Sequence, residues 1–258
     1  MQINRRDFLK KAGIAGVSLI AGGMLYKVFK GDDIISVTDQ SNVNTRWAML
    51  IDMKKCAGKP DCSDCISACN KGHNVPAIAD IRREIKWIWK ADFESVFPEN
   101  TNEYTDASVR SQNVIVACNH CENPPCVRVC PVGATWKRAD GIVMMDHHRC
   151  IGCRYCMAAC PYGSRSFNWK DPRRILSRND INAEYPVRTK GVVEKCNFCA
   201  ERIDTGKQPL CVEACTERAI LFGNIADSGS EIRRALKGKH VLRRKAELGT
   251  NPEIYYLI

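Results

Sequence analysis

Short runs of apolar residues, separated by polar and glycine-containing segments, recur along most of the chain. Five of these runs predict β-strands, at residues 47–52, 113–117, 134–137, 142–145 and 219–223. Ala139-Asp140-Gly141 separates the third run from the fourth, and Asp-Gly between apolar runs is a hairpin signal. Strands this short, lying between other motifs, indicate a small α+β fold.

Apolar residues also recur with helical spacing, between the first and second of these predicted strands. Pro76 could open a helix that runs to Lys90, because proline is tolerated in a first helical turn. Its apolar stripe consists of Ile78, Ile81, Ile85, Ile88 and Trp89. We expect this stripe to pack in the core, in preference to forming a docking surface. A basic C-terminal helix is predicted from Ser230-Glu231 to Gly249, and we expect the apolar residues 254–258 to dock on the body or on a partner.

The first thirty residues have the pattern of an export signal. A charged start that contains Arg5 and Arg6 precedes 15 uncharged residues, Ala12 to Tyr26. Such a run is typical of a signal's hydrophobic region and is short for a membrane span, and its glycines disfavour an amphipathic surface helix. The paired arginines resemble a twin-arginine signal, so we predict a signal segment over residues 1–31. No A-x-A cleavage site stands out, which leaves the segment either removed or kept as an anchor.

The 16 cysteines change this picture more than any other feature of the composition. They form four blocks of four: Cys56, Cys62, Cys65 and Cys69; Cys118, Cys121, Cys126 and Cys130; Cys150, Cys153, Cys156 and Cys160; Cys196, Cys199, Cys211 and Cys215. Disulfide-rich secreted domains are the alternative, but these are usually shorter than about 100 residues and their cysteines are scattered. Grouping into blocks favours metal ligation.

The third block, followed by Pro161, has the C-x2-C-x2-C-x3-C-P spacing of bacterial ferredoxins. Structural zinc sites instead use two pairs of ligands for one tetrahedron, and c-type haem requires C-x-x-C-H, which no block contains. His120 lies inside the second block, where we expect a hydrogen-bonding role rather than ligation. The other histidines (His73, His147, His148 and His240) are expected at the surface or in satisfied core positions.

Ferredoxin spacing also predicts how the blocks combine, because the fourth cysteine of a block binds the other cluster of its two-cluster unit. We predict four [4Fe–4S] clusters, held by Cys118, Cys121, Cys126 and Cys160; by Cys150, Cys153, Cys156 and Cys130; by Cys56, Cys62, Cys65 and Cys215; and by Cys196, Cys199, Cys211 and Cys69. This pairing gives two nested ferredoxin-like units, with long loops and a C-terminal helix, and a linear row of clusters.

The nested arrangement divides the chain into five segments. After the signal segment 1–31, residues 45–112 form the first half of the outer unit with a helical insertion, and residues 113–170 form the inner unit. Residues 171–226 provide a connector and the second half of the outer unit, and residues 227–258 the C-terminal helix and apolar tail.

The net charge of +10 at first suggests nucleic-acid binding. Sixteen thiolates contribute −16 and four oxidised cluster cores contribute +8, which would bring the loaded chain to +2. The basic residues are therefore better explained as counter-charges to anionic clusters, and nucleic-acid binding is disfavoured.

With the blocks placed, the chain resembles the four-cluster, ferredoxin-like iron–sulfur subunits of membrane oxidoreductases. The resemblance extends from Arg46 to Leu257, and it is greatest to the DsrO (Hme) periplasmic iron–sulfur subunits of Dsr membrane complexes. It rests on residues 86–89, 118–126, 163–169 and 247–257. The five residues between Cys56 and Cys62 depart from the family, in which most members have two.

The resemblance implies an electron-transfer subunit on the periplasmic or outer face of the cytoplasmic membrane, in a quinone-linked redox complex of sulfur metabolism, as in sulfate respiration. It implies as partners an NrfD-type integral membrane subunit, a multihaem cytochrome c and further subunits of that complex. The alternatives are an electron-transfer subunit of an exported molybdopterin oxidoreductase, of the tetrathionate or polysulfide reductase type, and an exported structural metal-binding protein. Catalysis is not expected, since the clusters would occupy every cysteine.

Overall fold

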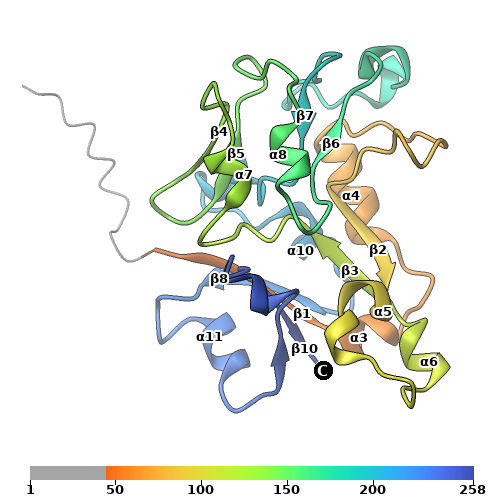
Figure 1. The fold of residues 1–258 in the computed structure, drawn as a ribbon, viewed down its shortest axis with the longest axis vertical. Helices are drawn as coiled ribbons and strands as arrows, with labels where there is room; N and C mark the ends of the chain where they lie inside the picture. Colours follow the sequence, from red (N-terminus) through yellow and green to blue (C-terminus); the bar gives the residue numbers. More distant parts are fainter. Residues whose placement is uncertain (1–44) are drawn as a thin grey trace, which may run out of the picture. The chain divides into compact units, whose positions relative to one another are not determined.

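Four small sheets and a set of short helices make up residues 45–258, the part of the chain that the computed structural model describes (Figure 1). The predicted signal segment 1–31 lies outside the described residues. The strands are β1 (Trp47–Asp52), β2 (Ile88–Asp92), β3 (Asn113–Ala117), β4 (Thr135–Lys137), β5 (Val143–Met145), β6 (Ser166–Phe167), β7 (Val193–Glu194), β8 (Ile220–Asn224), β9 (Val241–Leu242) and β10 (Ile254–Leu257).

The α-helices are short, most of them a single turn. They are α3 (Met53–Ala57), α4 (Asp64–Gly72), α5 (Phe93–Val96), α6 (Ala107–Arg110), α7 (Pro125–Arg128), α8 (Tyr155–Ala158), α9 (Ala200–Ile203), α10 (Leu210–Glu213) and α11 (Glu231–Leu236). Within residues 45–258, no helix combines the length and the apolar character that crossing a membrane requires.

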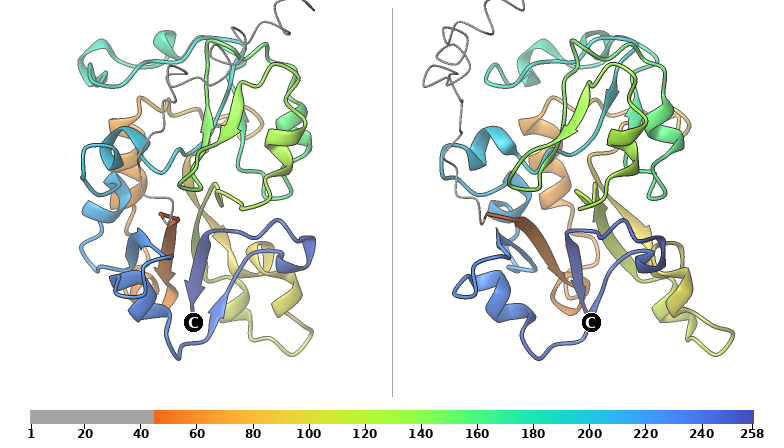
Figure 2. Two further views of the ribbon diagram at one scale, coloured as in Figure 1. Left: turned by 90° about the vertical axis from the view of Figure 1, so that its left-hand side faces the viewer. Right: turned by 60° about the vertical axis from the view of Figure 1, so that its left-hand side comes forward.

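The largest sheet joins the two ends of the described chain in the order β8-β1-β10-β9 (Figures 1 and 2). β1 is antiparallel to β8 and parallel to β10, with Leu50 opposite both Leu221 and Tyr255. Alternate residues of a strand point to opposite faces, so β1 serves two cores. Met49 and Ile51 join the main core, whereas Ala48 and Leu50 pack with Ile232 of α11.

Three two-stranded sheets hold the middle of the chain. β2 pairs with β3, β4 with β5 and β6 with β7, all antiparallel. The predicted strands 47–52 and 113–117 are confirmed, as is the Asp-Gly hairpin, whose Gly141 has a φ of +91°. The run predicted at 219–223 is β8, displaced by one residue.

The helix predicted over residues 76–90 is wrong. Irregular chain with one turn at residues 81–83 occupies this segment until β2 begins at Ile88, and β2 forms backbone hydrogen bonds with β3. The apolar stripe does not share one environment, because the Ile81 side chain is 75% exposed whereas Ile85 is buried. Lys86 donates its backbone N–H to Ser166 Oγ at 2.8 Å. In a continuous helix this N–H would instead be bonded to the carbonyl oxygen four residues earlier.

The basic C-terminal helix begins where predicted, with the Ser230 side chain capping the N–H of Arg233. It ends at Leu236, however, and not at Gly249, because Gly238 follows with a φ of +69° and the chain turns back into β9. The apolar tail docks on the body as expected. It does so as β10, an interior strand that the sequence pattern had not indicated.

One buried polar network ties distant segments together. Glu194 is fully buried and pairs with Arg188 at 2.7 Å. It also accepts hydrogen bonds from Trp87 Nε1 at 2.8 Å and Asn168 Nδ2 at 2.5 Å. Removing one partner of a buried ion pair typically costs about 3–5 kcal/mol, because the other charge is left buried and uncompensated.

Candidate metal centres

One group of four thiols surrounds a cavity between the first and fourth cysteine blocks. Cys56, Cys62, Cys65 and Cys215 line this cavity, together with Lys59 and Ile115. Burial raises the pKa of Cys65 to about 12, with further contributions from Cys56, Cys215 and Cys62. The antiparallel pairing of β1 with β8 brings these two blocks together, although about 130 residues of intervening chain separate them.

Cys69, the last cysteine of the first block, lies in a different group. Burial raises the pKa of its thiol, and the thiols of Cys196, Cys211 and Cys199 raise this pKa further. Each of these three contributes more than the thiol of Cys65 does. Helix α4, which carries Cys69, packs against α10, which carries Cys211. The structure therefore brings Cys69 together with the first three cysteines of the fourth block.

A third group combines cysteines of the second and third blocks. Cys118, Cys121, Cys126 and Cys160 line a cavity with Asn119, Val143, Tyr162 and Arg165. Burial raises the pKa of Cys121 to about 12, and Cys118, Cys126 and Cys160 contribute to the shift. Asn119 is fully buried, and neither atom of its side-chain amide has a hydrogen-bond partner in residues 45–258. An unpaired amide at the wall of a four-thiol cavity fits a bound group that accepts or donates hydrogen bonds.

Of the remaining cysteines, Cys156 lies on α8, which packs against α7, and Cys130 follows α7 in the chain. Cys156 is buried on α8, Cys150 and Cys130 are partly buried, and Cys153 is exposed. Burial opposes ionisation of the Cys130 thiol, but the backbone N–H groups of residues 132–135 outweigh it and lower the pKa. Successive N–H groups turned toward one sulfur form a concave anion site.

Thiols of neighbouring groups also act on each other, which orders the groups. Besides burial, Cys65 raises the pKa of Cys211, Cys118 raises that of Cys196, and Cys126 raises that of Cys156. Each pair joins one group to the next. These neighbours, from the Cys56 group through the Cys69 and Cys118 groups to the Cys150 group, are those that a linear row would give.

The chemistry of these groups suits soft metal ions. All sixteen cysteines are free thiols, with no disulfide among them. Thiolate ligands favour iron–sulfur clusters, zinc and copper(I). Because burial makes several of these thiols hard to ionise, a bound cation has to supply the charge that deprotonates them, and metal binding releases protons.

Two histidines lie beside these groups, and neither completes one. His120 is buried, accepts a hydrogen bond from Val143 N at Nδ1 (3.0 Å) and stacks on Phe198 with ring centroids 3.7 Å apart. Its predicted hydrogen-bonding role is confirmed. His73 is buried too, and its two ring nitrogens contact Cys69 O at 3.0 Å and Glu201 at 2.9 Å. With Cys199 and Glu201 it could in principle hold an ion, but Cys199 already belongs to the Cys69 group.

His147 and His148 differ sharply in exposure, and His240 is exposed. The His148 side chain is 98% exposed, whereas burial lowers the pKa of His147 to about 4.

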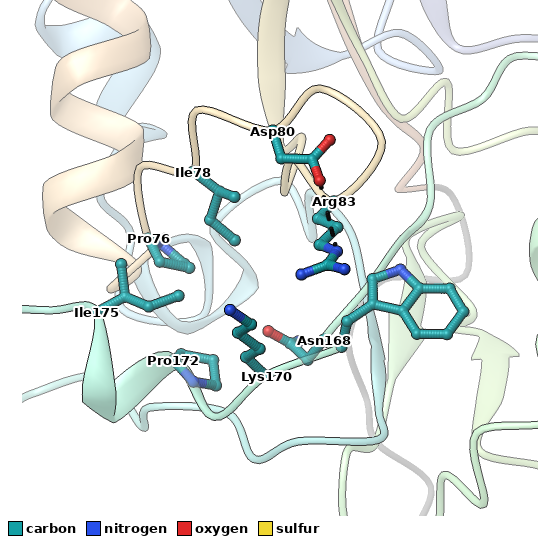
Figure 3. Close-up of a pocket in the computed structure, with 9 residues that line it drawn as sticks. Pro76, Ile78, Asp80, Arg83, Asn168, Lys170, Pro172 and Ile175 are labelled. Atoms are coloured by element: carbon teal, nitrogen blue, oxygen red, sulfur yellow. Dashed lines mark ion pairs between the residues drawn. The ribbon is translucent and has the colours of Figure 1, made fainter.

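A separate cavity of about 170 Å³ contains no cysteine (Figure 3). Ile78, Pro172 and Ile175 form its apolar wall, and Arg83 and Lys170 point toward it.

Comparison with known proteins bears directly on what these groups hold. A family described as 4Fe–4S dicluster domain matches residues 110–178 and 178–225. Over 98% of its length, and 97% of the relative's, the chain is 40% identical to the Hdr-like menaquinol oxidoreductase iron–sulfur subunit 1 of Archaeoglobus fulgidus. The chain belongs to this family of iron–sulfur subunits.

Two further relatives of this iron–sulfur subunit carry informative names. The menaquinone reductase iron–sulfur cluster-binding subunit of Nitratidesulfovibrio vulgaris is 35% identical, over 82% of this chain and 88% of that protein. A tetrathionate reductase subunit of Salmonella typhimurium is 33% identical, over 100% of this chain and 89% of that protein. The predicted resemblance to iron–sulfur subunits is confirmed, and so is the interpretation that the chain is an electron-transfer subunit and not a catalytic one.

Proposed function

We propose that this iron–sulfur protein holds four [4Fe–4S] clusters in a row and conducts electrons along them in a quinone-linked membrane complex. The observation that carries the proposal is the composition of the two cysteine-lined cavities. Each is lined by three cysteines of one block and the last cysteine of another, Cys215 in one case and Cys160 in the other. This is the exchange of fourth ligands that two-cluster ferredoxins use.

The same exchange assigns the other two clusters. Cys196, Cys199 and Cys211 would bind one with Cys69, and Cys150, Cys153 and Cys156 would bind the other with Cys130. The neighbouring thiol pairs between successive groups support a linear order. The clusters would supply the one-electron redox chemistry, and the chain would supply the thiolates, exclude water from the inner positions and fix the spacing.

The place of this protein in a cell is proposed from its relatives and its N-terminal sequence. Two relatives named above are subunits of a menaquinol oxidoreductase and of a menaquinone reductase, which supports a link to the quinone pool. The Arg5-Arg6 segment supports export to the outer face of the cytoplasmic membrane. We propose an NrfD-type membrane subunit and a multihaem cytochrome c as partners, in a complex of sulfur metabolism of the Dsr (Hme) type.

A second candidate function is electron transfer for an exported molybdopterin enzyme. The full-length match to the tetrathionate reductase subunit favours it. Affinity purification of the tagged protein from its native membrane separates the two. Co-purification of an NrfD-type subunit with a haem-containing cytochrome supports the first function, and co-purification of a molybdenum-containing subunit supports the second.

Metal analysis tests the cluster assignment itself. Anaerobically purified protein should contain about sixteen iron and about sixteen sulfide per chain, the number that four complete clusters require. Iron near twelve would mean that one group does not hold a cluster. Zinc without sulfide would contradict the assignment and support a structural metal-binding protein instead.

A further inference from the structure

Within residues 45–258, one buried positive charge has an ion-pair partner and three do not. Arg165, Arg188, Lys195 and Arg244 are the lysine and arginine side chains buried within residues 45–258. Arg188 forms an ion pair with Glu194 at 2.7 Å. No ion pair within residues 45–258 includes any of the other three. A buried charge without a partner is strongly unfavourable, so an opposite charge must come from elsewhere.

Arg165 contacts the Cys118 group directly. Its Nη2 donates to Cys126 Sγ at 3.0 Å and to Thr135 Oγ1 at 2.9 Å. The side chain lines the same cavity as Cys118, Cys121, Cys126 and Cys160, and the residue is 4% exposed. The nearest acceptor that could carry negative charge is therefore a cysteine sulfur.

Lys195 lies at the junction between this cavity and the next group. Its ammonium donates to the carbonyl oxygen of Val143, which lines the cavity, and to that of Cys196 at 2.7 Å. Carbonyl oxygens satisfy its hydrogen bonds but carry no net charge. The residue is 2% exposed, so water does not screen the ammonium.

We propose that Arg165 and Lys195 are fixed counter-charges of the cluster at Cys118, Cys121, Cys126 and Cys160, and that they raise its midpoint potential. The inference rests on the proposed function. A cluster with four thiolates carries −2 when oxidised and −3 when reduced, so a fixed cation stabilises the reduced form more. Cluster potentials respond to nearby charge and to hydrogen bonds on the sulfurs, and Arg165 provides both. Arg165 and Lys195 are thus positioning residues that act through the cluster's ligands and surroundings.

The effect should spare the cluster at Cys56, whereas the groups next to the Cys118 group receive part of it, since Lys195 also donates to Cys196 O and Arg165 also acts on Cys156. At the cavity of Cys56 the lining cation is Lys59, whose side chain is 48% exposed and pairs with Asp64 at 3.3 Å. A solvated, paired charge contributes little. The two cavities therefore differ in their fixed charge, and of these two the cluster at Cys118 is the one that the buried cations favour for holding an electron.

The test is an anaerobic redox titration of the purified protein, monitored by electron paramagnetic resonance, in Arg165→Met and Lys195→Met variants. Iron and sulfide are measured first, because they report on the proposed function independently of any potential. A Cys121→Ala variant identifies which signal belongs to this cluster. We expect each Met variant to shift its oxidised-to-reduced equilibrium about tenfold toward the oxidised form, equivalent to about 59 mV for one electron.

Two matched variants complete the design. Arg165→Lys keeps the positive charge and should retain most of the native potential. Lys190→Met removes the same charge from the surface of the segment that leads to Lys195, and should shift nothing. An unchanged potential in either Met variant with full iron would overturn the proposal. Loss of iron from both Met variants would overturn it as well, because the cations would then hold the cluster in place instead of setting its potential.

Discussion

Cys65 and Cys69 are one helical turn apart on α4, yet their thiols have different neighbours. Cys65 lines the cavity of Cys56, Cys62 and Cys215, whereas Cys69 lies among the cysteines of the fourth block. Four residues of helix advance the chain by about 6 Å, enough to move a ligand from one metal site to the next. A single short helix can thus contribute to two clusters and fix their separation.

This division of one block predicts for which pairs of cysteine substitutions the losses of iron do not add. Cys69→Ala and Cys211→Ala should each damage one cluster, with a loss of up to about four iron. Because both would bind the same cluster, the double variant should lose no more iron than either single variant, a non-additivity typical of a shared site. Iron analysis and electron paramagnetic resonance give the count.

The control pair is Cys69→Ala with Cys62→Ala, two cysteines from the same block. Under the nested arrangement these losses should add, to about eight iron, because the two residues would serve different clusters. The opposite result, with Cys69 and Cys62 non-additive and Cys69 and Cys211 additive, would mean that each block holds its own cluster.

At the scale of the elements, β10 contributes more than its four residues suggest. It lies between β1 and β9, and its Tyr256 is fully buried in edge-to-face contact with Phe97 at 5.1 Å. The Tyr256 hydroxyl has no hydrogen-bond partner within residues 45–258. An unsatisfied buried hydroxyl costs free energy, while the ring itself stabilises the core.

Substitutions of Tyr256 should separate these two contributions. Tyr256→Phe removes the unpaired hydroxyl and should leave the protein as stable as before, or up to about 1 kcal/mol more stable. Tyr256→Ala leaves a cavity in the core and should cost about 3–5 kcal/mol, a fall in Tm of roughly 10 °C. Thermal unfolding followed by circular dichroism measures both. A destabilised Phe variant would show that the hydroxyl does have a partner.

The elements also show what the sequence pattern can and cannot predict. Residues 47–52 and 113–117 alternate or cluster their apolar residues strongly enough for both strands to be predicted with the observed bounds. The stripe from Ile78 to Trp89 gave a wrong helix prediction, because its helical spacing has two unrelated causes. Ile85 packs in the core, and Ile88 begins a strand. β10 was missed because parallel pairing with β1 depends on a contact across about 200 residues, which no local pattern encodes.

For the metal centres, sequence spacing was informative because ligand geometry is local within a block. The groups around Cys56 and Cys118 contain the cysteines that ferredoxin spacing put together. The buried cations could not be predicted in the same way. Arg165 and Lys195 look like ordinary surface charges in the sequence, and their burial depends on contacts with residues distant in sequence, such as Cys126 and Val143.

At the scale of the whole molecule, the proposed clusters and the proposed export depend on each other. Clusters are assembled in the cytoplasm, and the ligands of each proposed cluster come from at least two segments, so the proposed export requires the chain to fold before it crosses the membrane. Replacing Arg5 and Arg6 together with lysine should leave cluster-loaded protein in the cytoplasm. Cell fractionation with iron analysis of each fraction measures this.

Lys10→Arg is the matched control, since it makes an equally conservative change in the same charged segment but leaves the arginine pair intact. It should be exported normally. Normal appearance of the double-lysine variant outside the membrane would contradict the twin-arginine prediction.

The position of β10 has a consequence for how the protein is made. The strand that completes the interior of the largest sheet follows all four cysteine blocks in the sequence. While these residues are still inside the ribosome, β1 has only β8 beside it, and the edge that β10 will cover stays open. A prematurely terminated chain can carry all sixteen cysteines and still lack this strand. The largest sheet therefore closes only after every cysteine block has been translated, because its interior strand comes later in the chain than all four blocks.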